Sequence, residues 1–175
     1  MKDMMLLIEP SIPALRRYAR ALLHDRAAAD DLVQDCLERA ISRWHQRRPD
    51  SDARTWLFAI LHNLAISRMR QITRRGRHLA LDDADETATA RPATQEDALR
   101  YRDLMRGLET LPEDQRSVLL LVSVEDLSYA EVAKVLDIPI GTVMSRLSRA
   151  RQKLLQFMET PATASATQPT LRRIK

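Results

Sequence analysis

The chain has 175 residues, of which 45% are hydrophobic and 30% are charged, so its composition is that of a globular protein with room for one or two small domains. Glycine is rare, with 3 residues, whereas Ala, Leu and Arg are frequent, which favours helix over sheet. The single cysteine, Cys36, excludes an internal disulfide and a multi-cysteine zinc site. The net charge of +4 suits a polyanionic partner but does not require one.

The N-terminus lacks the basic-then-apolar pattern of a signal peptide, and no apolar run approaches membrane-spanning length. We therefore expect a cytoplasmic protein with no membrane insertion. Apolar residues recur with helical spacing along the chain, and no segment alternates convincingly with the period of a strand. These patterns predict an all-α protein.

Three helices are predicted in the N-terminal half. The second covers "HDRAAADDLVQDCLERAISRW" and has Cys36 on its apolar stripe, so we expect a packed thiol rather than a reactive one. The basic, proline-containing "HQRRPDSD" interrupts the pattern, and Ser51 or Asp52 can then cap a long third helix. Trp44 and Trp56 fall on apolar stripes and are expected in the core.

Residues 77–95 lose the helical periodicity and are rich in Asp, Thr, Ala and Pro, which predicts a linker. Further along, Ser128 and Glu131 have capping-box spacing and open a short helix, "DIPIG" supplies a turn, and a second helix runs from about residue 140 to 157. Two helices joined in this way form a helix-turn-helix. The predicted fold is two small helical domains joined by a flexible acidic linker, the second containing the helix-turn-helix. Its segments are 1–76, the linker 77–95, 96–158 and a disordered tail, 159–175.

The stretch "GTVMSRLSRAR" has two different faces when it is wound as a helix. Val143 and Leu147 fall on the apolar side, whereas Ser145, Ser148 and Arg149 fall opposite them. Such a face can be merely solvated, but short polar residues and Arg also suit the major groove, where Arg pairs bidentately with guanine. The capping box, the Ile-Pro turn and the Arg spacing together favour DNA.

Three motifs resemble the bacterial sigma factors of RNA polymerase, and most closely their extracytoplasmic-function (ECF) group. "LPEDQRSVLLLVSVEDLSYAEVAKVLDIPIGTVMSRLSRARQKL" is similar to the family's promoter −35-reading domain. "ADDLVQDCLERA" resembles its polymerase-docking helix, and "ARTWLFAILHNLAISRMR" resembles its −10 element helix. The motifs stand in the expected order, and the short interval between the domains matches the ECF group.

The resemblance implies a polymerase-binding surface on the second helix. The pattern alone slightly favours a solvated surface for the acidic face of this helix over a binding surface, whereas in the family this face binds the clamp helices of the polymerase largest subunit. The implied residues are Asp31, Leu32, Gln34, Asp35 and Glu38.

The resemblance also implies two DNA sites. In the family, bases of the opened −10 element leave the stack, and amides and nearby cations read them. Asn63 matches the base-reading position, His62 is expected beside it on the helix surface, and residues 45–53 match the loop that pockets a flipped base. The implied −10 residues are Arg54, Asn63, Arg68, Arg70, Arg74 and Arg75. The implied −35 residues are Thr142, Met144, Ser145, Arg146, Ser148, Arg149 and Arg151.

Two of these positions depart from the family pattern. Met144 stands where the family often has Lys or Arg, and Ser148 stands where some members have a bulkier residue. Both departures can change the preferred −35 sequence.

We expect no catalytic residue, metal, cofactor or small-molecule substrate, because acid–base and metal-ligand clusters are not found in the sequence. The implied partners are core RNA polymerase, promoter DNA and an anti-sigma factor. The alternative is a helix-turn-helix transcriptional regulator that binds duplex operators without joining polymerase. Such a regulator would need a sensor or receiver domain in residues 1–75, where no strands are predicted.

Overall fold

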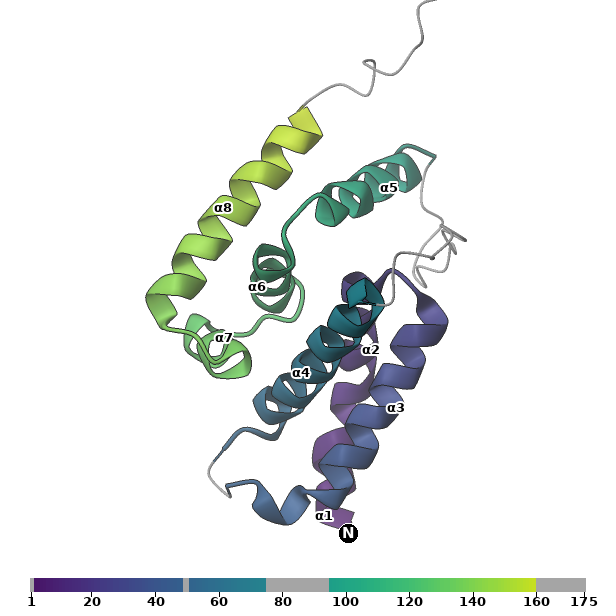
Figure 1. Cartoon of the computed structure of the whole chain (residues 1–175), viewed down its shortest axis with the longest axis vertical. Coiled ribbons are helices and arrows are strands. Elements are labelled where there is room, and N and C mark those ends of the chain that lie inside the picture. The colour runs from purple at the N-terminus through teal and green to yellow at the C-terminus, as the bar shows by residue number, and fades with distance from the viewer. Residues whose placement is uncertain (1, 49–50, 75–94, 160–175) are drawn as a thin grey trace, which may run out of the picture.

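The computed structural model describes residues 2–48, 51–74 and 95–159, and every regular element within these ranges is helical (Figure 1). The all-α prediction is therefore confirmed. The predicted linker and tail fall almost entirely outside the described residues. The α-helices are α1 (Lys2–Ile8), α2 (Ile12–Leu23), α3 (Arg26–Ser42), α4 (Ala53–Arg74), α5 (Gln95–Glu109), α6 (Glu113–Ser123), α7 (Tyr129–Leu136) and α8 (Ile140–Glu159).

Helices α1 to α4 enclose one part of the core. The ring of Tyr18 on α2 meets the ring of Phe58 on α4 edge to face, with centroids 5.6 Å apart, and both side chains are buried. Cys36 on α3 is also buried, and its thiol donates to the carbonyl of Leu57 at 3.6 Å. Burial raises the pKa of this thiol to about 12, because an apolar surrounding disfavours the thiolate. The predicted packed cysteine is confirmed.

Side-chain caps fix where the helices begin. The Asp25 carboxylate accepts from the Ala28 amide before α3, and the Asp52 carboxylate accepts from the Thr55 amide at the start of α4. The Ser128 capping box is complete at α7. The predicted caps at Asp52 and Ser128 are therefore present. The first fixes the start of α4, which carries most of the −10 residues, and the second fixes the start of α7, which opens the helix-turn-helix.

Helix α1 was not predicted from the sequence. Its Ile8 is buried, whereas Met5, Leu6 and Leu7 are exposed, so apolar residues lie around the helix rather than along one stripe. A continuous apolar run of this kind carries no helical period.

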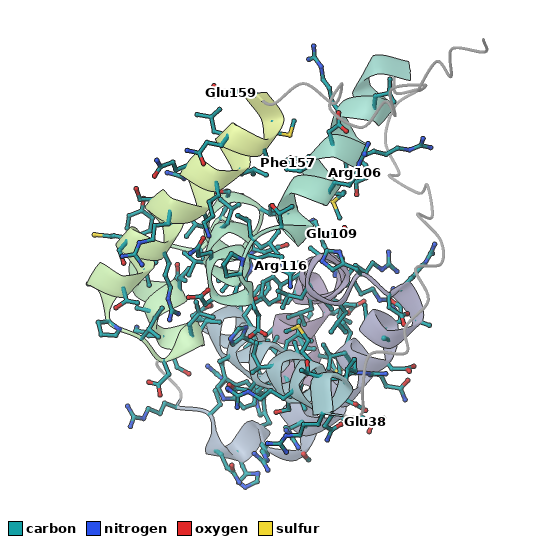
Figure 2. The ribbon with its side chains drawn as sticks, turned by 45° about the horizontal axis from the view of Figure 1, so that its top comes forward. Glu38, Arg106, Glu109, Arg116, Phe157 and Glu159 are labelled. Atoms are coloured by element: carbon teal, nitrogen blue, oxygen red, sulfur yellow. The ribbon has the colours of Figure 1, made fainter. Side chains whose placement is uncertain are left out.

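Helices α5 to α8 form the second group, with Val118 and Leu121 of α6 buried beside Val143 and Leu147 of α8. Helix α5 crosses α8 at Gly107. A Cβ atom at this position would lie 2.6 Å from Cδ1 of Leu154 and 2.9 Å from Cδ1 of Phe157. Figure 2 shows Phe157 on the side of α8 that faces α5. Glycine therefore permits the close approach of these two helices.

The two groups pack against each other, with α2 beside α6 and α4 beside α7 (Figure 1). At one end of this interface, the Arg116 guanidinium lies 2.9 Å from Nε2 of His24, and Nδ1 of His24 lies 3.6 Å from Glu109. At the other end, Arg17 and Arg54 meet Glu125. The polar character of these contacts is typical of an interface between domains that can separate.

Candidate nucleic-acid and polymerase interfaces

The helix-turn-helix consists of α7, a turn at Asp137 and α8. Asp137 adopts a left-handed conformation with φ of 53°, which ends α7 and redirects the chain. Val143, Leu147 and Ala150 of α8 are buried, as the apolar side of "GTVMSRLSRAR" requires. The opposite side is exposed and carries Met144, Ser145, Ser148, Arg149 and Arg151.

Two −35 residues are less exposed than the others. The Nε atom of Arg146 lies 3.1 Å from the Asp114 carboxylate at the start of α6, and the Arg146 side chain is 28% exposed. Thr142 is half-buried, and its carbonyl accepts from the Ser145 hydroxyl at 3.1 Å. The exposed centre of the candidate −35 surface is therefore formed by the serines and Arg149, with Arg146 held at one edge.

The candidate −10 residues extend along α4 but have different surroundings. Asn63 is exposed near the middle of the helix, and Arg70 and Arg74 are exposed closer to its end. Arg68 is half-buried and donates to the carbonyl of Ala28 at 3.2 Å. Arg75 lies outside the described residues.

Arg54 differs from the other −10 candidates, because it contacts the second helical group. Its Nη2 atom donates to the carbonyl of Glu125 at 2.7 Å and lies 3.7 Å from the carboxylate of the same residue. Arg17 of α2 binds that carboxylate with two hydrogen bonds. Neither Arg17 nor Glu125 stands out in the sequence, since their pairing joins residues 108 positions apart and leaves no local pattern.

His62 is half-buried beside Asn63, so it is only partly exposed at the helix surface where it was expected. Its Nδ1 atom is 3.1 Å from the hydroxyl of Tyr18, within the first group. Burial lowers the pKa of His62 to about 4, because the charged imidazolium is poorly solvated there. The ring therefore supports the helix beside Asn63 through the Tyr18 hydroxyl and is only partly exposed to solvent.

The two tryptophans pack against the core, as predicted. Their rings meet edge to face with centroids 5.9 Å apart, and the guanidinium of Arg47 lies 4.8 Å from the Trp44 centroid. These contacts hold the start of the segment 45–53 against α4. Both indoles are half-buried.

The candidate polymerase surface lies on α3. Asp31, Gln34, Asp35 and Glu38 are exposed, and Gln34 donates to the Glu38 carboxylate at 3.0 Å. Figure 2 shows Glu38 on the outer edge of the first group, away from α8. Leu32 is the exception, because it is only 2% exposed and packs in the core. Leu32 therefore supports this surface from below and does not line it.

Within the described ranges, no group of three or more His, Cys, Asp or Glu residues could hold a metal ion. Among the same residues, no helix is long and apolar enough to span a membrane.

The molecule presents an acidic helix face, an arginine-bearing helix with an exposed amide and a helix-turn-helix with a polar face. Together these features are typical of a transcription factor that contacts both protein and DNA.

Comparison with known families assigns both helical groups. The Sigma2 domain of PhyR matches residues 8–62, and sigma-70 region 4 matches residues 101–154. The ECF RNA polymerase sigma factor EcfG of Rhodopseudomonas palustris is 36% identical over 148 residues, which cover 82% of this chain and 78% of EcfG. The ECF RNA polymerase sigma factor SigC of Mycobacterium tuberculosis is 38% identical over 149 residues, 79% of this chain and 75% of SigC.

A solved structure is similar across nearly the whole chain. The sigma factor RpoE of Bartonella quintana, in complex with the anti-sigma factor NepR, aligns with a TM-score of 0.79 at 29% identity. The alignment covers 92% of this chain and 99% of that one. The chain belongs to the ECF family of RNA polymerase sigma factors.

Proposed function

We propose that this sigma factor binds core RNA polymerase through α3, reads the −35 element with α8 and engages the opened −10 element with α4. The observation that carries the proposal is the exposed polar face of α8, on a helix-turn-helix whose apolar face is fully packed. The chain itself catalyses nothing, and the polymerase forms the phosphodiester bonds. Its place of action is the cytoplasm, where the polymerase and promoter DNA are found.

The polymerase contact is electrostatic. Asp31, Asp35 and Glu38 present carboxylates on one exposed side of α3, and this side accepts a basic surface of the polymerase clamp. The contact also steers association, since opposite charges speed the encounter of two proteins.

The DNA contacts act in sequence. Arg149 and the neighbouring serines read base edges of the duplex −35 element, where the major groove distinguishes all four base pairs. Asn63 acts later, because an amide can read an extruded base only after the −10 duplex has opened. Arg70 and Arg74 follow the strand backbone from the same helix.

An anti-sigma factor is a further partner of this chain. The related Bartonella quintana sigma factor is seen with NepR, and a second similar structure, with a TM-score of 0.70 and 25% identity, is CnrH with the cytosolic domain of CnrY. The same surfaces on this chain are available to a regulator of that kind.

Reconstitution with core polymerase tests the proposal. The purified chain and core enzyme are incubated with a random promoter library, and bound sequences are selected and transcribed. We expect a −35 and a −10 motif, both dependent on core enzyme, and transcripts that start downstream. A duplex operator bound equally well without polymerase would instead support the regulator alternative.

A further inference from the structure

One ion pair between the two helical groups is almost completely buried on its acidic side. Glu125 follows α6 and is 1% exposed, although its neighbour Asp126 is exposed. The Arg17 guanidinium donates to the two carboxylate oxygens of Glu125, from Nε at 2.9 Å and from Nη2 at 2.7 Å. This two-pronged geometry is the strongest form of an arginine–carboxylate contact.

A second arginine completes the site from another helix. Arg54 donates to the Glu125 carbonyl, and its guanidinium lies 3.7 Å from the carboxylate. The same guanidinium lies 5.5 Å from the centroid of the Phe58 ring, which helps to fix its position. Two cations of the first group thus converge on one anion of the second group.

We propose that Arg17 and Arg54 form an anion-binding site, which Glu125 fills in this closed arrangement and a backbone phosphate of promoter DNA fills when the two groups separate. The inference rests on the proposed function. A phosphate offers paired oxygens to an arginine fork in the same way as a carboxylate does. The side chains of Arg17 and Arg54 are 53% and 38% exposed even while Glu125 is bound, so solvent and a phosphate can approach them.

Occupation of the site by Glu125 excludes phosphate, so closure and DNA binding compete. Closure also packs α7 against α4, the helix that carries Asn63. A protein whose open form is a minor fraction binds its partners more weakly by that fraction. Glu125 is therefore an internal substitute for a DNA phosphate, and it restrains the free sigma factor.

Variants of the full chain separate the two parts of this proposal. Glu125→Gln removes the charge while keeping the size of the side chain. Asp126→Asn removes the same charge one residue away and is the matched control, since Asn also tolerates the left-handed conformation of Asp126 (φ 53°). Arg17→Ala removes the fork. Unchanged circular dichroism verifies that each variant is folded.

The first measurement is the distance between the groups in the free protein, by electron–electron double resonance between spin labels at the exposed positions Ser42 and Gln152. We expect a longer and broader distance distribution for Glu125→Gln and Arg17→Ala, and the wild-type distribution for Asp126→Asn. Core polymerase should bind Glu125→Gln at least fivefold more tightly than wild type. An unchanged distance distribution for Glu125→Gln would overturn the restraint.

The second measurement is promoter affinity of the assembled holoenzyme across a salt series. Each phosphate contact contributes about one to the slope of log affinity against log salt, so Arg17→Ala should lower that slope by about one. Glu125→Gln should leave it unchanged, because Glu125 has already left the site. A wild-type slope for Arg17→Ala would overturn the phosphate site. A wild-type chain that bound no core enzyme would refute the proposed function and the phosphate site, whereas the distance measurement would still decide the restraint.

Discussion

The Asp114 carboxylate lies 3.1 Å from Nε of Arg146, and this ion pair joins the start of α6 to the recognition helix. The contact orients the Arg146 guanidinium along the edge of the helix-turn-helix. Arg149 lies almost one turn further on α8, on its exposed face. The two arginines should therefore contribute differently to binding.

Arg149→Ala should flatten the −35 sequence preference, whereas Arg146→Ala should weaken binding to every sequence alike. Losing a bidentate base contact costs about 1–3 kcal/mol and acts at one position, while losing a phosphate contact weakens binding to all sequences alike and lowers the salt slope by about one. A binding panel of all single-base −35 variants, measured at two salt concentrations, distinguishes these effects. A uniform loss across the panel for Arg149→Ala would assign it to the backbone.

Asp35→Arg should abolish binding to core polymerase and leave the fold intact. Asp35 is exposed on α3, so a reversed charge disturbs only the proposed docking surface and places like charges together in the complex. Glu9→Arg, an exposed acidic reversal outside α3, is the control and should bind normally. The assignment fails if Asp35→Arg binds core enzyme within a factor of two of wild type.

Asn63→Ala should impair opening of the promoter more than the first binding step. The amide is exposed on α4 and meets a base only after that base has left the stack. Permanganate footprinting reports the opened −10 bases, and a filter assay at low temperature reports the closed complex. Equal permanganate reactivity for mutant and wild-type complexes would remove Asn63 from the site.

Local patterns predicted most of this architecture. The helix-turn-helix, the Ser128 capping box and the packed Cys36 follow from residues within one or two helical turns of each other. The burial of Leu32 was also readable, because Ala29, Leu32, Val33 and Cys36 have the spacing of a single buried stripe. The family resemblance placed Leu32 in the docking surface, although its position on this stripe predicts that it is buried.

The interface between the two groups could not be predicted in this way. Arg17 and Glu125 look like ordinary surface charges, and only the packing of α2 beside α6 brings them together. Arg54 was assigned to DNA from its place in a motif, and nothing nearby in the sequence indicates its second partner. Contacts between distant charged residues leave no periodicity, so a structure is needed to find them.

Cys36 should resist thiol reagents in the folded protein. Burial raises the pKa of its thiol to about 12, so the reactive thiolate is scarce at pH 8 and the sulfur is also shielded from solvent. The rate of modification by Ellman's reagent should be at least about a hundredfold lower in the native protein than in urea, because a buried thiol reacts only when the structure around it opens. Rapid modification without denaturant would show that the first group opens readily.

The stability of the first helical group should fall as the pH falls from about 6.5 to about 4, and His62 should account for a large part of this loss. The pKa of His62 is about 4 in the folded protein and 6.5 without burial, so the unfolded chain takes up a proton first as the solution becomes acidic. Between pH 7 and pH 5 this uptake should lower the free energy of unfolding by about 2 kcal/mol.

His62→Gln removes the titration and can still accept from the Tyr18 hydroxyl. Urea unfolding gives the free energy of unfolding of wild type and variant at both pH values. Relative to wild type, the variant should gain about 2 kcal/mol of stability between pH 7 and pH 5. A difference that does not change with pH would mean that the imidazole is solvated and takes up its proton in the folded protein as well.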